Sequence, residues 1–304
     1  MGHDHHHHHD HHTATNQYNT AFGISVFLNL AFVVIQSIYA IQADSMSLLA
    51  DAGHNLGDVL GLAFAWGANW LLTREANKRY SYGHKKTTIL AALANALLLV
   101  AASAIISYES IINLMSHKTV NSTIVIVIAL IGVFINAGTA LLFLKGSKDD
   151  LNIKGAFVHL AADALISAGV VITGILIHFT QWNWLDPIIG LVIVFTILIS
   201  TWGLLRDSVN LLLAAVPAGI DQNAVKKYLQ NISGVSEVHD LHIWGLSTRE
   251  NALTAHLVMP EKTLSDDDYQ TINHELIHHH RIHHVTIQVE KGENPDPCGK
   301  AKTC

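Results

Sequence analysis

Six apolar segments, each long enough to cross a lipid bilayer, dominate the N-terminal part of this 304-residue chain. A membrane-spanning helix needs about 20 apolar residues. Half of all residues are hydrophobic and only 14% are charged, whereas a soluble domain carries about 25% charged residues. The sequence therefore predicts a membrane all-α domain of six transmembrane helices. The predicted spans are Thr20–Gln42, Ser47–Leu72, Thr87–Leu114, Thr123–Leu144, Gly155–His178 and Leu185–Leu205.

Basic residues predict the orientation of these spans, because cytoplasmic loops carry an excess of Lys and Arg. Only Lys118 falls on the opposite side, and no Lys or Arg precedes Arg74. Both termini are therefore predicted to be cytoplasmic. Because the charge follows the membrane topology, it forms no nucleic-acid-binding patch. The basic residues on the predicted cytoplasmic side are Arg74, Lys78, Arg79, Lys85, Lys86, Lys145, Lys148, Lys154 and Arg206.

Two of the spans contain ionisable residues in an H-x-x-x-D pattern. His54 and Asp58 lie in the second span, and His159 and Asp163 in the fifth. A charge at the centre of a membrane helix costs at least about 2.5 kcal/mol, so such residues indicate a functional site. Residues four apart share one helix face, and the two antiparallel spans can bring both pairs together. Satisfied interhelical hydrogen bonds are the alternative for a lone histidine, but two matched pairs favour one shared site.

Two imidazoles and two carboxylates form an N2O2 ligand set that suits tetrahedral Zn²⁺. The carboxylates also neutralise the cation in a low-dielectric environment, and the histidines disfavour Ca²⁺ and Mg²⁺. Asp51 lies two turns before Asp58 on nearly the same stripe. The sequence leaves two interpretations of Asp51 open, an accessory carboxylate on the exit path or a solvated carboxylate.

A transport mechanism follows from what the chain lacks and from what the site contains. No glycine-rich phosphate loop is present, so no nucleotide is expected as a partner. Metal binding needs neutral histidines and ionised aspartates, so metal and protons compete for the same atoms. We therefore expect a proton-coupled secondary transporter. Two alternatives stay open: an intramembrane metallohydrolase, although no span contains H-E-x-x-H, and a membrane metal sensor that does not transport.

After Arg206 the pattern becomes that of a soluble domain. Asp221–Gln230 is predicted as a helix, followed by strands at Val235–Trp244 and Ala252–Met259. Ser265 is expected to cap a second helix, whose first turn is acidic and whose last turn is histidine-rich. A third strand is predicted at His283–Glu290. The order αββαβ predicts a small α+β domain with its helices on one face of the sheet.

Both ends of the chain are polar tails. Residues 1–15, which begin MGHDHHHHHDHH, cannot bury a core and are expected to be disordered. A purification tag is one explanation, but the interrupting aspartates favour a native metal-collecting tail. Cys298 and Cys304 lie in the other tail, 293–304, where they suit soft metal ligands better than a disulfide. Between the tails we expect a six-helix membrane domain at 16–208 and a cytoplasmic domain at 209–292.

Four motifs together resemble the cation diffusion facilitator family, in its CzcD-like zinc exporter branch: SLLADAGHNLGD, FVHLAADALISAG, RYSYGHKK and VHDLHIW. The resemblance implies a homodimer in the bacterial inner membrane, a cytoplasmic ferredoxin-like domain, and exchange of Zn²⁺ for protons by alternating access, with Cd²⁺ or Co²⁺ as alternative substrates. It carries the transport-site role onto His54, Asp58, His159 and Asp163. Manganese and iron members have D-x-x-x-D pairs instead, so His54 favours zinc.

The resemblance also implies metal ligands outside the membrane. It places His239, His256 and Glu290 at a structural or regulatory zinc site of the cytoplasmic domain, with His242 as an addition. Core packing is the alternative for His239, because strand alternation puts it on one face with Ile243. Cys298 and Cys304 resemble tail cysteines that complete this site, although their spacing is wider than C-x-x-C. His84 corresponds to a loop metal ligand, with a basic interfacial residue as the alternative.

Overall fold

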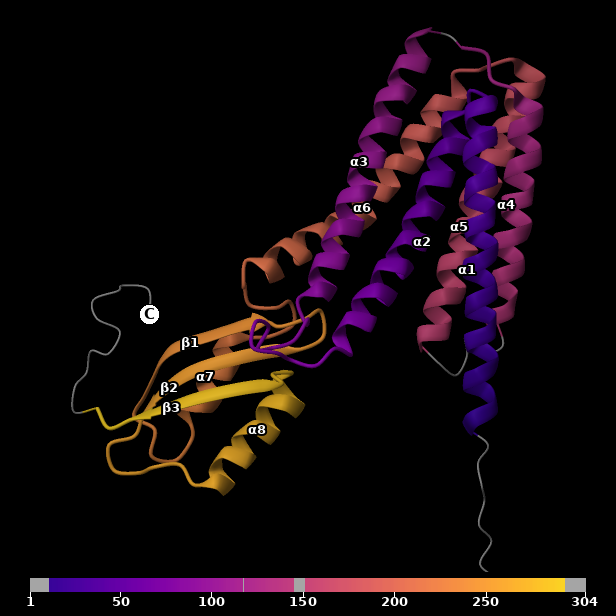
Figure 1. Ribbon diagram of the computed structural model, residues 1–304. Coiled ribbons are helices and arrows are strands. Elements are labelled where there is room, and N and C mark those ends of the chain that lie inside the picture. The colour runs from indigo at the N-terminus through magenta and orange to yellow at the C-terminus, as the bar shows by residue number, and fades with distance from the viewer. Residues whose placement is uncertain (1–10, 117, 145–150, 293–304) are drawn as a thin grey trace, which may run out of the picture. The chain divides into compact units, whose positions relative to one another are not determined.

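The computed structural model describes residues 11–116, 118–144 and 151–292. Cys298, Cys304 and residues 1–10 of the predicted tails lie outside the described residues. Residues 11–15, which the sequence also predicts to be disordered, belong to the first helix. Six long helices precede a small α+β domain in the chain (Figure 1). They are α1 (His11–Gln42), α2 (Met46–Leu72), α3 (Thr87–Ser116), α4 (Ser122–Phe143), α5 (Leu151–Thr180) and α6 (Leu185–Leu212). The chain divides into two compact units, one of Met1–Leu62 with Leu97–Thr201 and one of Ala63–Ala96 with Trp202–Cys304.

Within the described residues, five of the long helices are apolar and long enough to cross a membrane. These stretches are Gly23–Gln42, Thr87–Ser116, Ser122–Phe143, Ile153–Thr180 and Leu185–Leu212. The remaining predicted span, α2, forms a helix of 27 residues, which is about 40 Å long and could cross the hydrocarbon core. Its composition is less apolar than that of the other five helices, because polar residues interrupt its sequence: Asp51, His54, Asn55 and Asp58.

The first unit buries a hydrophobic core to which all six long helices contribute residues. Two glycines allow its helices to approach closely. A Cβ atom on Gly132 of α4 would lie 2.9 Å from the ring of Phe32 on α1, and one on Gly57 of α2 would lie 2.2 Å from Leu99 on α3. Small residues at helix crossings are typical of membrane proteins, where close packing replaces the hydrophobic effect between helices.

A buried carboxylate joins α6 to the beginning of α2. Asp186, in the first turn of α6, accepts hydrogen bonds from the hydroxyls of Ser45 and Ser47 and from the backbone N–H of Met46. The first N–H groups of a helix have no partner within the helix. Asp186 therefore provides one for α2, and this contact fixes the start of the helix that carries His54 and Asp58.

The soluble part of the second unit has the predicted order αββαβ. Its elements are α7 (Gln222–Gln230), β1 (Glu237–Gly245), β2 (Asn251–Val258), α8 (Asp266–His280) and β3 (His284–Glu290). The sheet order is β1-β2-β3; β1 and β2 are antiparallel, and β2 and β3 are parallel. Both helices lie on one face of the sheet (Figure 1), and they bury apolar side chains against it. The predicted fold class, membrane helices followed by an α+β domain, is therefore confirmed.

A bulge in β1 overturns the core-packing interpretation of His239. The register of β1 against β2 shifts between His239 and His242, and Asp240 has a positive φ of 49°. Because the bulge inserts an extra residue, the alternation of faces changes across it. Val238 before the bulge and Ile243 after it are both buried in the core. His239 therefore lies on the sheet face opposite Ile243, away from α7 and α8.

The α2–α3 loop contacts the β1–β2 turn within the second unit. Lys85 forms an ion pair with Glu250, and the backbone N–H of Thr248 donates to Oγ1 of Thr88 at 3.1 Å. Thr88 lies in the first turn of α3. The turn between the first two strands is thus attached to the beginning of a membrane helix.

Candidate metal centres

Four ionisable side chains of the first unit meet between α2 and α5. Each histidine approaches the aspartate of the opposite helix. Nε2 of His54 lies 3.1 Å from Oδ1 of Asp163, and Nε2 of His159 lies 3.2 Å from Oδ2 of Asp58. The contacts within each helix are longer, at 3.9 Å for His54–Asp58 and 3.7 Å for His159–Asp163. The two H-x-x-x-D motifs, more than 100 residues apart in the chain, therefore form one cluster.

Three members of this cluster already suit a single cation. His54, Asp58 and Asp163 each offer a ligand atom, and these atoms lie within 4.8 Å of one another. His159 falls outside that group despite its contact with Asp58, so a four-ligand site requires its imidazole to move toward the other three. Oδ2 of Asp58 is shielded from solvent and makes no hydrogen bond of regular geometry, although Nε2 of His159 lies 3.2 Å away. A buried carboxylate oxygen is costly unless it is well paired, and a divalent cation would pair it more fully.

The four side chains of the cluster differ in their exposure to solvent. The exposed fraction of the side chain is 48% for His159 and 33% for Asp58, but 17% for His54 and 4% for Asp163. With the orientation indicated by the basic loops, His159 and Asp58 lie toward the cytoplasmic ends of α5 and α2. The more exposed half of the cluster is therefore its cytoplasmic half.

The structure excludes one of the two interpretations of Asp51, that of a solvated carboxylate. Its side chain is fully buried, and its Oδ2 accepts hydrogen bonds from Nε2 of Gln36 at 2.6 Å and from Oγ of Ser167 at 3.0 Å. The other oxygen, Oδ1, is buried without a hydrogen-bond partner. The helices α1, α2 and α5 pack around this position, so water does not reach it. Asp51 lies nearer than His54 and Asp58 to the beginning of α2, the end predicted to face the outside.

The partners of Asp51 are residues that sequence reasoning did not single out. Gln36 is a polar residue within the first apolar span, and Ser167 lies one helical turn after Asp163 on α5. Both are fully buried. The signal for Gln36 was its amide in an apolar span, since membrane helices place such groups against other polar groups. No comparable signal marked Ser167, because serine occurs often in apolar helices as a small residue.

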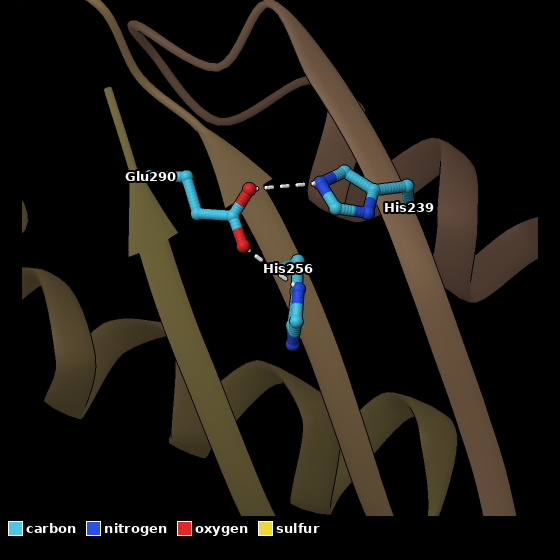
Figure 2. A group of neighbouring side chains, drawn as sticks. All are labelled: His239, His256 and Glu290. Carbon is cyan, nitrogen blue, oxygen red and sulfur yellow. Dashed lines mark hydrogen bonds and ion pairs between the residues drawn. The ribbon is translucent and has the colours of Figure 1, made fainter. Parts of the chain in front are cut away.

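A second cluster lies on the uncovered face of the soluble domain's sheet. His239, His256 and Glu290 come from β1, β2 and β3, and their ligand atoms lie within 4.8 Å of one another (Figure 2). Nε2 of His239 is 3.1 Å from Oε2 of Glu290, and Nδ1 of His256 is 2.8 Å from Oε1. The pairing of the strands sets this arrangement, because His239 is directly opposite His256 in the register.

The chemistry of these three groups suits a zinc ion. Nδ1 of His256 is buried and lacks hydrogen-bond geometry to any partner, although the carboxylate of Glu290 is close. Two imidazoles and one carboxylate are a recurring zinc ligand set with an open fourth position. His239, His256 and Glu290 could therefore hold Zn²⁺.

Asp240 is a member of this surface that the sequence did not point to as a ligand. The bulge brings its carboxylate within 3.4 Å of Nε2 of His256, on the other side of the ring from Glu290, and within 2.7 Å of Nε2 of His242. His242 joins no group of three metal-ligating side chains in the described residues. Its contact with Asp240 places it at the edge of the sheet cluster.

His84 also stands apart from both groups within the described part of the chain. Its ring lies 4.6 Å from that of Tyr80 in the α2–α3 loop, and its backbone carbonyl accepts a hydrogen bond from Thr87. A loop metal site at His84 stays a prediction. The same holds for Cys298 and Cys304, which lie outside the described residues.

Comparisons with known proteins give family matches over most of the chain. Residues 23–213 match the cation efflux transmembrane domain, and residues 217–292 match the cytoplasmic domain of cation efflux proteins. The chain is 33% identical over 272 residues to the cadmium, cobalt and zinc/H(+)-K(+) antiporter of Bacillus subtilis, covering 88% of this chain and 87% of that protein.

Two further relatives have similar coverage. The chain is 37% identical over 235 residues to the metal cation efflux system protein CzcD of Cupriavidus metallidurans, which covers 77% of this chain and 74% of the relative. It is 32% identical over 272 residues to the zinc transporter ZitB of Escherichia coli, covering 89% and 85%.

Proposed function

The chain belongs to the cation diffusion facilitator family, and from this premise we propose that it exports Zn²⁺ from the cytoplasm in exchange for protons. Membership makes it a metal cation efflux transporter and not an enzyme, so the alternatives of a metallohydrolase and of a non-transporting sensor fall away. It is an integral membrane protein with a cytoplasmic C-terminal domain. The family matches also support a junction between the two domains near residues 213–217.

The observation that carries the proposal is the crossed pairing of imidazoles and carboxylates between α2 and α5. His54 contacts Asp163, and His159 contacts Asp58. Two carboxylates balance the charge of one divalent cation, which lowers the cost of holding it within a membrane domain. Imidazole favours Zn²⁺ over Ca²⁺ or Mg²⁺. Cd²⁺ and Co²⁺ are the alternative substrates, and the names of two relatives include zinc.

Protons and metal exclude each other at this cluster. A protonated imidazole donates to the opposite carboxylate and occupies the same nitrogen and oxygen atoms that a cation needs. When Zn²⁺ arrives from the cytoplasmic side, where His159 and Asp58 are more exposed, it displaces those protons. When the cluster opens outward, protons displace the metal. Alternating access through one site therefore links the two flows.

Flux measurements in proteoliposomes test the proposal. Asp163 is the most buried carboxylate of the cluster, and Asp163→Ala should reduce Zn²⁺ flux by at least about 100-fold, the upper end of the effect of outer-shell changes. Asp44→Asn is a matched control, because Asp44 is an exposed carboxylate paired with Lys118 outside the cluster. Zinc flux that does not respond to an imposed pH gradient would contradict proton exchange.

We further propose that the cytoplasmic domain forms a homodimer and regulates transport through Zn²⁺ held by His239, His256 and Glu290. The domain family that matches residues 217–292 is named for dimerisation, which supports the dimer. When bound, the ion would cross-link three strands of the sheet. The contacts from the β1–β2 turn to Lys85 and Thr88 support a route from this domain to α3.

The regulatory proposal has its own test. Deleting Pro217–Cys304 should abolish stimulation of transport by cytoplasmic Zn²⁺. Glu250→Lys should weaken that stimulation, and Lys85→Glu combined with Glu250→Lys should restore part of it, because the pair of opposite charges is re-formed. Stimulation that survives the deletion would argue against regulation by the cytoplasmic domain and leave the transport site unaffected.

A further inference from the structure

Two histidines of α8 stand side by side on the surface of the soluble domain. His274 and His278 are four residues apart, so they lie on one helix face. Their ring centroids are 4.3 Å apart with an interplanar angle of 41°. Both residues are exposed. The segment reads His-Glu-Leu-Ile-His, which has the H-E-x-x-H spacing that presents two imidazoles to one zinc ion on a helix.

The rest of α8 holds this pair in position. Ile272 and Leu276 are buried in the hydrophobic core, which fixes the face that the helix turns toward the sheet. Ser265 caps the N-terminus of α8 in a capping box. At the C-terminus the backbone N–H of Arg281 donates a hydrogen bond to the carbonyl of Leu276. The two imidazoles therefore project from a fixed helix, which lowers the entropy cost of chelation.

The intervening glutamate does not serve the pair. Oε2 of Glu275 lies 3.7 Å from Nε2 of His279. Burial is the main cause that raises the pKa of Tyr228 on α7, and the negative charge of Glu275 is the second. It therefore faces a different side of α8 from His274 and His278. Within the described residues, no third histidine, cysteine or carboxylate completes the pair. The catalytic use of the motif lacks both its base and its third ligand, and metal binding is left.

We propose that His274 and His278 form a separate, exchangeable metal site that takes Zn²⁺ from the cytosol. Two imidazoles supply the protein ligands, and water completes the coordination. The site is distinct from the sheet cluster, because α8 packs on the face of the sheet opposite His239 and His256. A water-rich coordination shell suits a site that gains and releases metal at the protein surface. The proposal concerns binding and stands independently of the proposed transport function.

Histidine footprinting of the full-length protein in detergent tests the site directly. Diethyl pyrocarbonate modifies free imidazoles, and mass spectrometry resolves each position. Adding Zn²⁺ should protect His274 and His278 together, with one midpoint. His274→Asn should raise the Zn²⁺ concentration that protects His278 by at least about tenfold, because the second ligand of a chelate acts at high effective concentration.

Two matched variants separate the alternatives. His279→Asn removes one imidazole from the same turn of α8 and should leave the protection of the pair unchanged, because His279 faces Glu275. His256→Asn damages the sheet cluster and should also leave it unchanged. The proposal is overturned if Zn²⁺ fails to protect the pair, if the Zn²⁺ concentration that protects His278 is unchanged in His274→Asn, or if the protection disappears in His256→Asn.

Discussion

The cluster between α2 and α5 and the cluster on the sheet have related ligands but are held in different ways. The membrane cluster joins two helices through side chains alone, and its members range from 48% to 4% exposed. The sheet cluster joins neighbouring strands whose backbones are hydrogen-bonded, and its members have similar exposure, from 22% to 15%. Helices can slide past one another with modest changes in packing, whereas paired strands cannot without losing their ladder.

This difference indicates different roles for the same chemistry. A transport site has to take up and release its ion, so its ligands should lie on elements that can move apart. A site that stabilises or senses metal should keep its ligands in register. The membrane cluster also has twice as many carboxylates as the sheet triad, so it would fully balance the charge of a divalent cation. Predictions that exchange or remove single ligands test this contrast.

The largest expected effect comes from neutralising one carboxylate in each cluster and comparing the two losses of flux. Asp58→Asn should reduce proteoliposome Zn²⁺ flux by at least about 100-fold, because the site loses a ligand and half of its balancing charge. Glu290→Gln should leave flux at high Zn²⁺ within about threefold of wild type, since the four proposed transport ligands are intact. Equal losses in both variants would remove the division of roles between the clusters.

His54 tests metal preference within the membrane cluster. His54→Asp replaces an imidazole by a carboxylate, which favours Mn²⁺ over Zn²⁺ as ligand. Zinc flux should fall by about tenfold or more and manganese flux should rise, which competition between the two metals in proteoliposomes would measure. An unchanged ratio of the two fluxes would show that His54 does not set the selectivity.

Asp51 should have an intermediate effect, because its hydrogen bonds join α2 to Gln36 on α1 and Ser167 on α5 and do not reach the four cluster residues. Asp51→Asn keeps the size of the side chain but removes the charge that accepts from Gln36 and Ser167. Outer-shell changes typically cost about 10- to 100-fold in metal affinity or activity, and we expect the lower end for Zn²⁺ flux. Ser167→Ala should produce a smaller loss in the same direction. Wild-type flux in both variants would limit the network to packing.

The smallest effect concerns the helix that carries His274 and His278. The backbone N–H and the hydroxyl of Ser265 hold the pKa of Asp268 below its usual range. Because the pKa is lower in the folded state, the ionised carboxylate of Asp268 stabilises the cap at pH values above the ordinary pKa of about 4. This stabilisation is lost as the pH falls through the pKa of the folded state. Ser265→Ala should speed amide exchange in the first turn of α8 about fivefold at neutral pH. The difference should shrink below about pH 4; a constant difference would exclude this pair as its cause.

Much of the fold followed from patterns that act locally. Spans are set by length and hydropathy, and the capping of α8 by Ser265 follows from the residue type and its neighbours. The order αββαβ is confirmed with element ends shifted by one or two residues. The sequence could not show which side of a strand a residue occupies after a bulge, so alternation wrongly grouped His239 with Ile243. The bulge depends on pairing with β2, a contact between distant residues.

The sequence by itself determined that His54 and Asp58 share one helix face, as do His159 and Asp163, because a helix brings residues four apart together. It also determined which residues carry metal-binding chemistry. Only the tertiary structure decided that Asp51 is buried against Gln36 and Ser167, and that Asp240 turns toward His256. The physical reason is that helical periodicity is a property of the local backbone, whereas burial and strand register depend on how separate segments pack.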